Sequence, residues 1–175
     1  KLQGPAAAAQ AARSGKQQGP QVDLVQRLNA GTDTMSTLVG RISTLLESRD
    51  KSQVLRGLRV VYNLSDKKEY SQQFAEMRAL VGPLIQRTQP ANDKAVRDLA
   101  LQCLAKLTVA PECAVEFVDC LGWPMLIAAL QSGDTALELA ASLLMVVLLK
   151  NPKNRDVFVS AKAIPVLLVM LQSEN

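Results

Sequence analysis

Apolar residues recur at helical spacing along the chain from residue 35 onward, and short polar breaks separate the runs. In residues 135–149, aliphatic side chains lie on more than one side of a helix, which is typical of a helix packed between neighbours. Asp134 precedes this run and can accept hydrogen bonds from its first amides, and Asn151-Pro152 follows its end. The same pattern predicts helices at residues 36–47, 51–64, 83–88, 94–109, 112–119 and 124–130.

The helical pattern repeats with a fixed offset. Pro83, Pro124 and Pro165 are each 41 residues apart (83 + 41 = 124 and 124 + 41 = 165), and each is placed to occupy the first position of a helix. Other similar pairs share this offset: Pro111 and Pro152, Phe117 and Phe158, Ala100 and Ala141, Leu104 and Met145, and Leu107 and Leu148. A helical chain with such a period stacks two or three helices per unit, and each unit buries its apolar face on the next.

We therefore predict an all-α fold: a right-handed α-solenoid of three to four units, at about residues 35–68, 69–110, 111–150 and 151–175, with the last unit incomplete. The apolar residues that keep the register are predicted to be buried between units; they are Ala100, Leu104, Leu107, Phe117, Ala141, Met145, Leu148 and Phe158. Residues 1–21, rich in Ala, Gln, Gly and Pro, are predicted to form a flexible linker, and residues 22–175 the repeat domain. Val22, Val25 and Leu28 indicate a short amphipathic helix at the start of that domain.

The segment NPKNRDVFVSAKAIPVLLVMLQS, residues 151–173, resembles the armadillo repeat. That repeat opens with an Asn-Pro-x-Asn-Arg turn and a short helix, and then runs through Ile-Pro into a Leu-rich helix. The matching residues here are Asn151, Pro152, Asn154, Arg155, Ala163, Ile164, Pro165, Leu167, Leu168 and Leu171. HEAT repeats have a similar length, but the short first helix and the Ile-Pro entry favour the armadillo family. The resemblance covers roughly residues 35–175 and is most specific in the last unit.

The resemblance implies that the third helix of each unit lines a concave groove that binds extended peptides or protein segments. In the cargo-binding importins of this family, a Trp and an Asn one turn apart form a ladder along that groove. The corresponding positions here are Arg59 and Asn63, Gln102 and Lys106, and Leu144 and Leu148. Only Asn63 matches and none of these positions is a Trp, so the importin ladder is not expected. Trp123 is expected to pack between units.

Composition and charge narrow the partner class. Hydrophobic residues make up 48% of the chain and aromatic residues only 3%, which suits aliphatic helix packing. The net charge is +4, but the basic residues are scattered among acidic ones, so no nucleic-acid surface is predicted. The most basic stretch combines Lys67 and Lys68 with Arg56 and Arg59. It is either a solvated helix end or the positive end of a groove that takes an acidic segment of a partner.

Candidate chemistry is sparse. The chain has no histidine and no Gly-rich phosphate loop, so neither His-dependent catalysis nor a cofactor is expected, and we predict no enzyme activity. Its three cysteines lack the spacing of a disulfide framework or a zinc site and fit a reducing compartment, so we expect the cytoplasm, with the nucleus or a cilium left open. No membrane segment is predicted, because the apolar run of residues 139–149 is shorter than the ~20 residues that a span requires.

The sequence thus leaves two functional hypotheses. The first is a non-catalytic scaffold in a larger protein or assembly, which binds a protein partner through the concave third-helix surface at Arg56, Arg59, Asn63, Gln102 and Lys106. The alternative is a co-chaperone or assembly-factor module of the tetratricopeptide–armadillo type, acting on a client protein. In either case the apolar run of residues 164–171 is expected to be covered by further repeats or by another protein.

Overall fold

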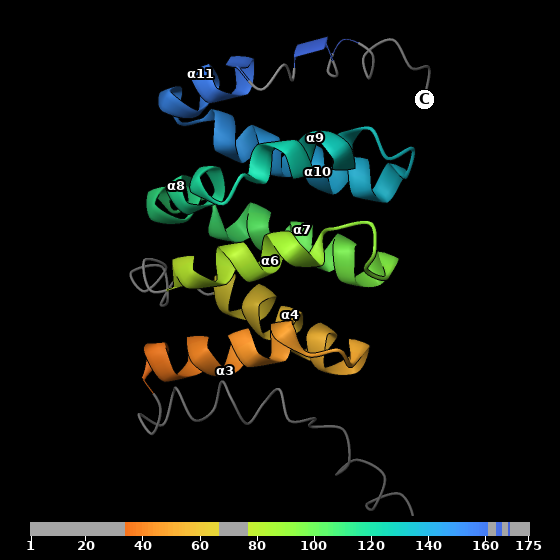
Figure 1. Cartoon of the computed structure of the whole chain (residues 1–175). Coiled ribbons are helices and arrows are strands. Elements are labelled where there is room, and N and C mark those ends of the chain that lie inside the picture. The colour runs from red at the N-terminus through yellow and green to blue at the C-terminus, as the bar shows by residue number, and fades with distance from the viewer. Residues whose placement is uncertain (1–33, 67–76, 161–163, 166–167, 169–175) are drawn as a thin grey trace, which may run out of the picture.

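The structure is a computed structural model that describes residues 34–66, 77–160, 164–165 and 168. Within these ranges the fold is all-helical, as the sequence predicts, and no strand occurs. The helices succeed one another from one end of the molecule to the other in chain order (Figure 1). They are α3 (Met35–Glu47), α4 (Lys51–Ser65), η2 (Arg78–Leu80), α6 (Val81–Arg87), α7 (Lys94–Leu107), α8 (Pro111–Asp119), α9 (Gly122–Leu130), α10 (Thr135–Leu149) and α11 (Pro152–Ser160). The predicted linker and the short helix predicted at residues 22–30 lie outside the described residues.

Three of the helices begin in the same way, at an aspartate. Asp50, Asp93 and Asp134 are the N-caps of α4, α7 and α10. Each carboxylate accepts a hydrogen bond from the second amide of its helix, at 2.8, 3.0 and 3.2 Å respectively. Such a cap stabilises a helix by about 1 kcal/mol, because those first amides have no acceptor within the helix. The predicted role of Asp134 as a cap is therefore confirmed.

The middle of the molecule is a row of three long helices. Helix α7 packs between α4 and α10, while α3, α6 and α9 pack on α4, α7 and α10 in turn. All eight residues predicted to be buried are buried, including Leu104 at the centre of the row and Phe117 and Phe158 near its end. The thiol of Cys103 is also buried there and lies 3.3 Å from the carbonyl oxygen of Leu58 on α4.

Ion pairs join successive helices of this row at their N-termini. The ammonium of Lys51, the first residue of α4, lies 2.7 Å from the carboxylate of Asp93, and that of Lys94, the first residue of α7, lies 2.8 Å from that of Asp134. The hydrogen bond from each lysine holds the pKa of its aspartate below the usual value. All of these side chains except that of Asp134 are largely exposed, so the pairs align the helix ends more than they stabilise the fold.

An aromatic cluster joins α8, α9 and α11. The ring of Trp123 stands edge-on to those of Phe117 and Phe158, with centroids 6.2 and 5.4 Å away. Gly122 makes this arrangement possible, since a Cβ added there would lie 2.6 Å from Cε1 of Phe117 and closer still to Cζ. Trp123 is buried between helices, as expected from the sequence.

The positions of two prolines differ from the sequence prediction. Pro83 and Pro124 occupy the third position of α6 and α9, not the first, because these helices begin at Val81 and Gly122. All amides of a first turn lack an intrahelical acceptor, so a proline is tolerated at any of these positions and does not by itself mark the start. By contrast, Pro111 and Pro152 are the first residues of α8 and α11.

Helix α10 packs between neighbours, as the sequence predicts for residues 135–149, but the described helices do not cover it on every side. Its contacts with α7, α9 and α11 leave one apolar stripe uncovered, formed by Leu139, Leu143 and Val146. These side chains are 62%, 56% and 56% exposed. Ile164 and Leu168, in the apolar run near the C-terminus, are exposed too, and most of that run lies outside the described residues.

Candidate functional site

The five residues predicted to bind a partner lie on two neighbouring helices. Arg56, Arg59 and Asn63 belong to α4, and Gln102 and Lys106 to α7. Arg59, Asn63 and Gln102 are exposed, whereas Arg56 and Lys106 are half-buried. The structure brings Gln102 and Lys106 together in one groove, and it does not bring the three α4 residues into it.

The charge of Lys106 is already compensated. Its ammonium forms an ion pair with Asp66 at the end of α4 and lies 4.0 Å from the centroid of the Tyr62 ring. Burial lowers the pKa of Lys106, but the Asp66 carboxylate and Tyr62 outweigh burial, so the pKa is raised and the group stays protonated. An incoming carboxylate would therefore have to compete with Asp66 for this ammonium.

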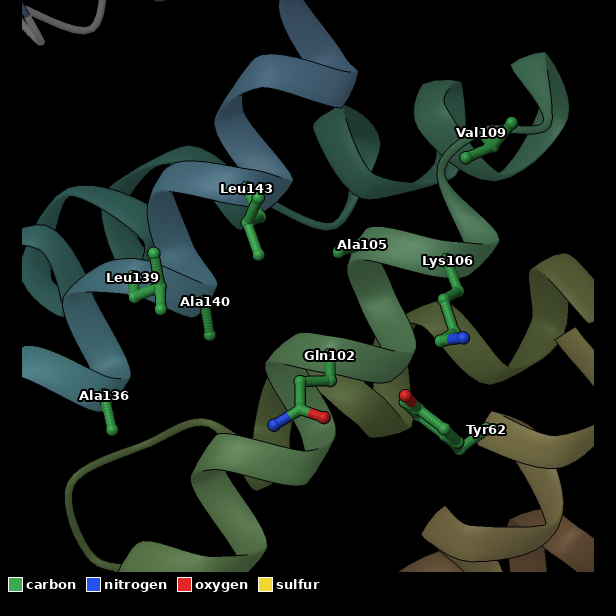
Figure 2. A pocket seen from close by; sticks show the side chains of 9 residues that line it. All are labelled: Tyr62, Gln102, Ala105, Lys106, Val109, Ala136, Leu139, Ala140 and Leu143. Atoms are coloured by element: carbon green, nitrogen blue, oxygen red, sulfur yellow. The ribbon is translucent and has the colours of Figure 1, made fainter. Parts of the chain in front are cut away.

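A groove of about 450 Å³ lies between α7 and α10, with Tyr62 of α4 at one edge. Figure 2 shows Leu139 and Leu143 on the α10 side, Gln102 and Ala105 on α7, and Lys106 next to Tyr62. We call this the α7–α10 groove; its lining residues are Tyr62, Gln102, Ala105, Lys106, Val109, Ala136, Leu139, Ala140 and Leu143. Its volume is in the range of sites that hold small ligands or side chains, about 300–1,000 Å³.

The groove is mainly aliphatic, and its apolar character continues onto the surface. Leu139 and Leu143 line it, Val146 extends the same stripe of α10 by another turn, and Val109 at its other edge is 65% exposed. Residues spaced by four and three positions lie on one side of a helix, so the three α10 side chains form a continuous stripe. Large apolar side chains grouped on a surface are typical of a binding site.

The sequence prediction missed this stripe because of a register error. It assigned Leu144 and Leu148 to the groove, and both are fully buried in the core. The offset of 41 residues found in the sequence pairs Gln102 with Leu143 and Lys106 with Val147 (102 + 41 = 143 and 106 + 41 = 147). Applied consistently, that offset would have found Leu143.

Gln102 is the one polar side chain in the α7–α10 groove without a partner in the described part of the chain. Gln102 is exposed, and its side chain extends from α7 at the lining of the groove (Figure 2). A carboxamide both donates and accepts hydrogen bonds, as a peptide group does. The groove therefore combines aliphatic walls with one group that can pair with a polypeptide backbone.

A second hollow of about 300 Å³ adjoins the groove, and Val109 lines both. We call it the Pro111 hollow; its lining residues are Thr108, Val109, Pro111, Ala114, Val147, Leu148, Lys150, Asn151 and Pro152. Lys150 is exposed at this end of α10 and forms no ion pair with any described residue. The two concavities together follow α10 from Ala136 to Lys150.

Two of the three cysteine thiols are buried. Burial raises the pKa of the Cys113 thiol to about 12 and also raises that of Cys103, so both thiols stay protonated at neutral pH. No group of three or more Cys, Asp or Glu that could hold a metal occurs among the described residues. Among those residues, no single helix is long and apolar enough to cross a membrane. Helices α8 and α9 reach the required length and apolar content only when they are taken together, and the chain bends by 88° between them.

The comparisons with known proteins bear on the fold alone. No protein-family model and no curated protein matches the chain. Its structure is similar to two crystal structures of engineered proteins from the Northeast Structural Genomics Consortium, each with a TM-score of 0.72, 22% identity and 90% of this chain covered. The chain spans 37% of one of these proteins and 62% of the other.

Proposed function

We propose that the chain is a segment of an armadillo-like α-solenoid with units of about 41 residues, and that it binds a partner protein without a catalytic step of its own. The groove-lining face of α7 and α10, with the exposed side chains of α4 beside it, is the proposed binding surface. The observation that carries this proposal is the α7–α10 groove with its exposed aliphatic stripe.

The recurring capping pattern supports the solenoid. Asp50, Asp93 and Asp134 cap successive helices of the row at spacings of 43 and 41 residues (93 − 50 = 43 and 134 − 93 = 41). Two of these caps receive a lysine from the preceding helix of the row, so neighbouring units are joined in the same way twice. A stack of this kind presents one side chain of each long helix at equivalent places along a continuous surface.

The character of that surface supports protein binding. Exposed Arg59, Asn63 and Gln102 lie on its polar part, and Leu139 and Leu143 on its apolar part. Interfaces combine an apolar centre with a polar rim in this way. The exposed aliphatic side chains of α10 do not contribute to the core, and polar residues at these positions would make the surface more soluble. Their presence is therefore better explained by contact with a partner.

Site-specific photocrosslinking in the full chain tests this proposal. Benzoylphenylalanine would replace Arg59 or Gln102 on the proposed surface and, as a control, Val115 on α8, which is 53% exposed and lines neither concavity. We expect the same partner to be crosslinked in cell extract from positions 59 and 102, and not from 115. Equal crosslinking from all three positions, or capture from 115 alone, would contradict the proposal.

A further inference from the structure

The charge of the α7–α10 groove does not suit the acidic occupant that the sequence suggests. Lys106 is the one cation that lines it, and Asp66 already neutralises this ammonium. An acidic side chain placed among Ala105, Leu139 and Leu143 would lose its hydration without gaining a free counter-charge. A neutral aliphatic side chain has no such hydration to lose, and it covers apolar surface that is otherwise exposed to water.

The length and the ends of the path describe the occupant further. Helix α10 has 15 residues and is therefore about 22 Å long, which about six or seven residues of extended chain would follow. The amide of Gln102 lies along this path, where it can pair with a backbone peptide group. At the far end the exposed Lys150 provides an ammonium that no described residue neutralises.

We propose that the α7–α10 groove and the Pro111 hollow bind an extended segment of a partner protein. This segment carries large aliphatic side chains, followed by a carboxylate that pairs with Lys150. The inference rests on the proposed function and specifies the partner's chemistry. Leu139 and Leu143 hold the aliphatic side chains, Gln102 pairs with the backbone, and Lys150 fixes the direction of the segment.

Selection from a phage-displayed library of random dodecapeptides tests this inference on the full chain. We expect the enriched peptides to share two or more Leu, Ile, Val or Met residues followed by Asp or Glu. Binding of a synthetic enriched peptide, followed by fluorescence anisotropy, should weaken about tenfold or more for Leu139→Lys and for Leu143→Lys, the loss expected when one aliphatic side chain is no longer buried.

Matched variants separate the parts of the inference. Val115→Lys places the same charge on an exposed valine of α8 and should leave binding unchanged. Lys150→Glu should weaken binding of the selected peptide, and a peptide with Lys in place of its acidic residue should restore it. Because Leu139, Leu143, Val115 and Lys150 are all exposed, these variants are expected to fold, which circular dichroism would verify.

The remaining outcomes overturn the inference in distinguishable ways. Acidic peptides without aliphatic residues, whose binding is lost in Arg59→Glu and not in Leu143→Lys, would refute this inference and leave the proposed function standing. The absence of any enriched peptide would overturn this inference alone, and photocrosslinking at positions 59 and 102 would then decide whether the proposed function stands. Self-association in analytical ultracentrifugation that Leu139→Lys and Leu143→Lys abolish would show that a second copy of the chain occupies the groove instead.

Discussion

Replacing Gly122 by alanine tests whether the packing of the aromatic cluster, and not helix propensity, governs this position. Gly122 is the first residue of α9 and is buried, and the Cβ of alanine would lie 2.6 Å from Cε1 of Phe117. Phe117 is fully buried and its ring stands against that of Trp123, so the ring has no open space to enter. We expect the substitution to destabilise the fold.

The magnitude follows from a comparison with Gly40, which lies in α3 with nothing within 4 Å of its added Cβ. Gly40→Ala should stabilise the fold by up to about 1 kcal/mol, because alanine loses less backbone entropy in a helix. Gly122→Ala can gain no more than this from backbone entropy, and it adds an overpacking cost of about 1–3 kcal/mol. The two substitutions should therefore differ by about 1–3 kcal/mol in their effect on the free energy of unfolding.

Urea unfolding of both variants, followed by circular dichroism, measures this difference. A double-mutant cycle with Phe117→Leu, which removes the end of the ring, should abolish most of the penalty at Gly122, with a coupling of about 0.5–3 kcal/mol. If Gly122→Ala is as stabilising as Gly40→Ala, or if its cost persists unchanged beside Phe117→Leu, the reasoning about the aromatic cluster is wrong.

Three further predictions concern the row of long helices. Leu104→Ala should lower the free energy of unfolding by about 2–5 kcal/mol, because it opens a cavity in the packed interior where Leu104 is fully buried; a loss below about 1 kcal/mol in urea unfolding would contradict this placement. The hydrogen bond from Lys94 lowers the pKa of the Asp134 carboxyl in the folded chain. This pairing therefore contributes its full stability above the pKa of an unfolded aspartate, about 3.9. That contribution is lost as the pH falls through the lower pKa of the folded chain. Asp134→Asn, which keeps a capping side chain, should therefore be less stable than the wild-type chain at pH 7 and approach it in acid; a difference in melting temperature that is constant from pH 7 to pH 2 would argue against this pairing. Asn154→Ala should cost about 0.5–1.5 kcal/mol in thermal or urea unfolding, because it removes one buried hydrogen bond between α11 and the end of α10. The buried Asn154 amide donates to the carbonyl oxygen of Leu148 at 3.0 Å, and that oxygen keeps the backbone N–H of Asn151 as a donor at 3.2 Å. An unchanged midpoint would show that this hydrogen bond does not stabilise the fold.

The sequence determined the helices and most of the core because both depend on neighbours along the chain. An aspartate cap acts on amides two or three residues away, so Asp134 marks the start of α10 without any tertiary information. The apolar period similarly identified Leu104 and Met145 as core, since one face of each helix is apolar over several turns. The proline positions were less well determined, because a first turn accepts proline at more than one place.

Only the tertiary structure decided which side chains of α10 are covered and which charges remain available. Leu143 and Leu144 are chemically identical and differ by about 100° around the helix, so the covered one is defined by the position of the neighbouring helices. In the sequence Lys106 looks like a cation that is free to bind an acidic partner. In the structure its charge is already neutralised, because the fold brings Asp66, 40 residues away along the chain, to its ammonium. Both outcomes depend on contacts between distant segments, and local hydrogen bonding and apolar periodicity do not encode such contacts.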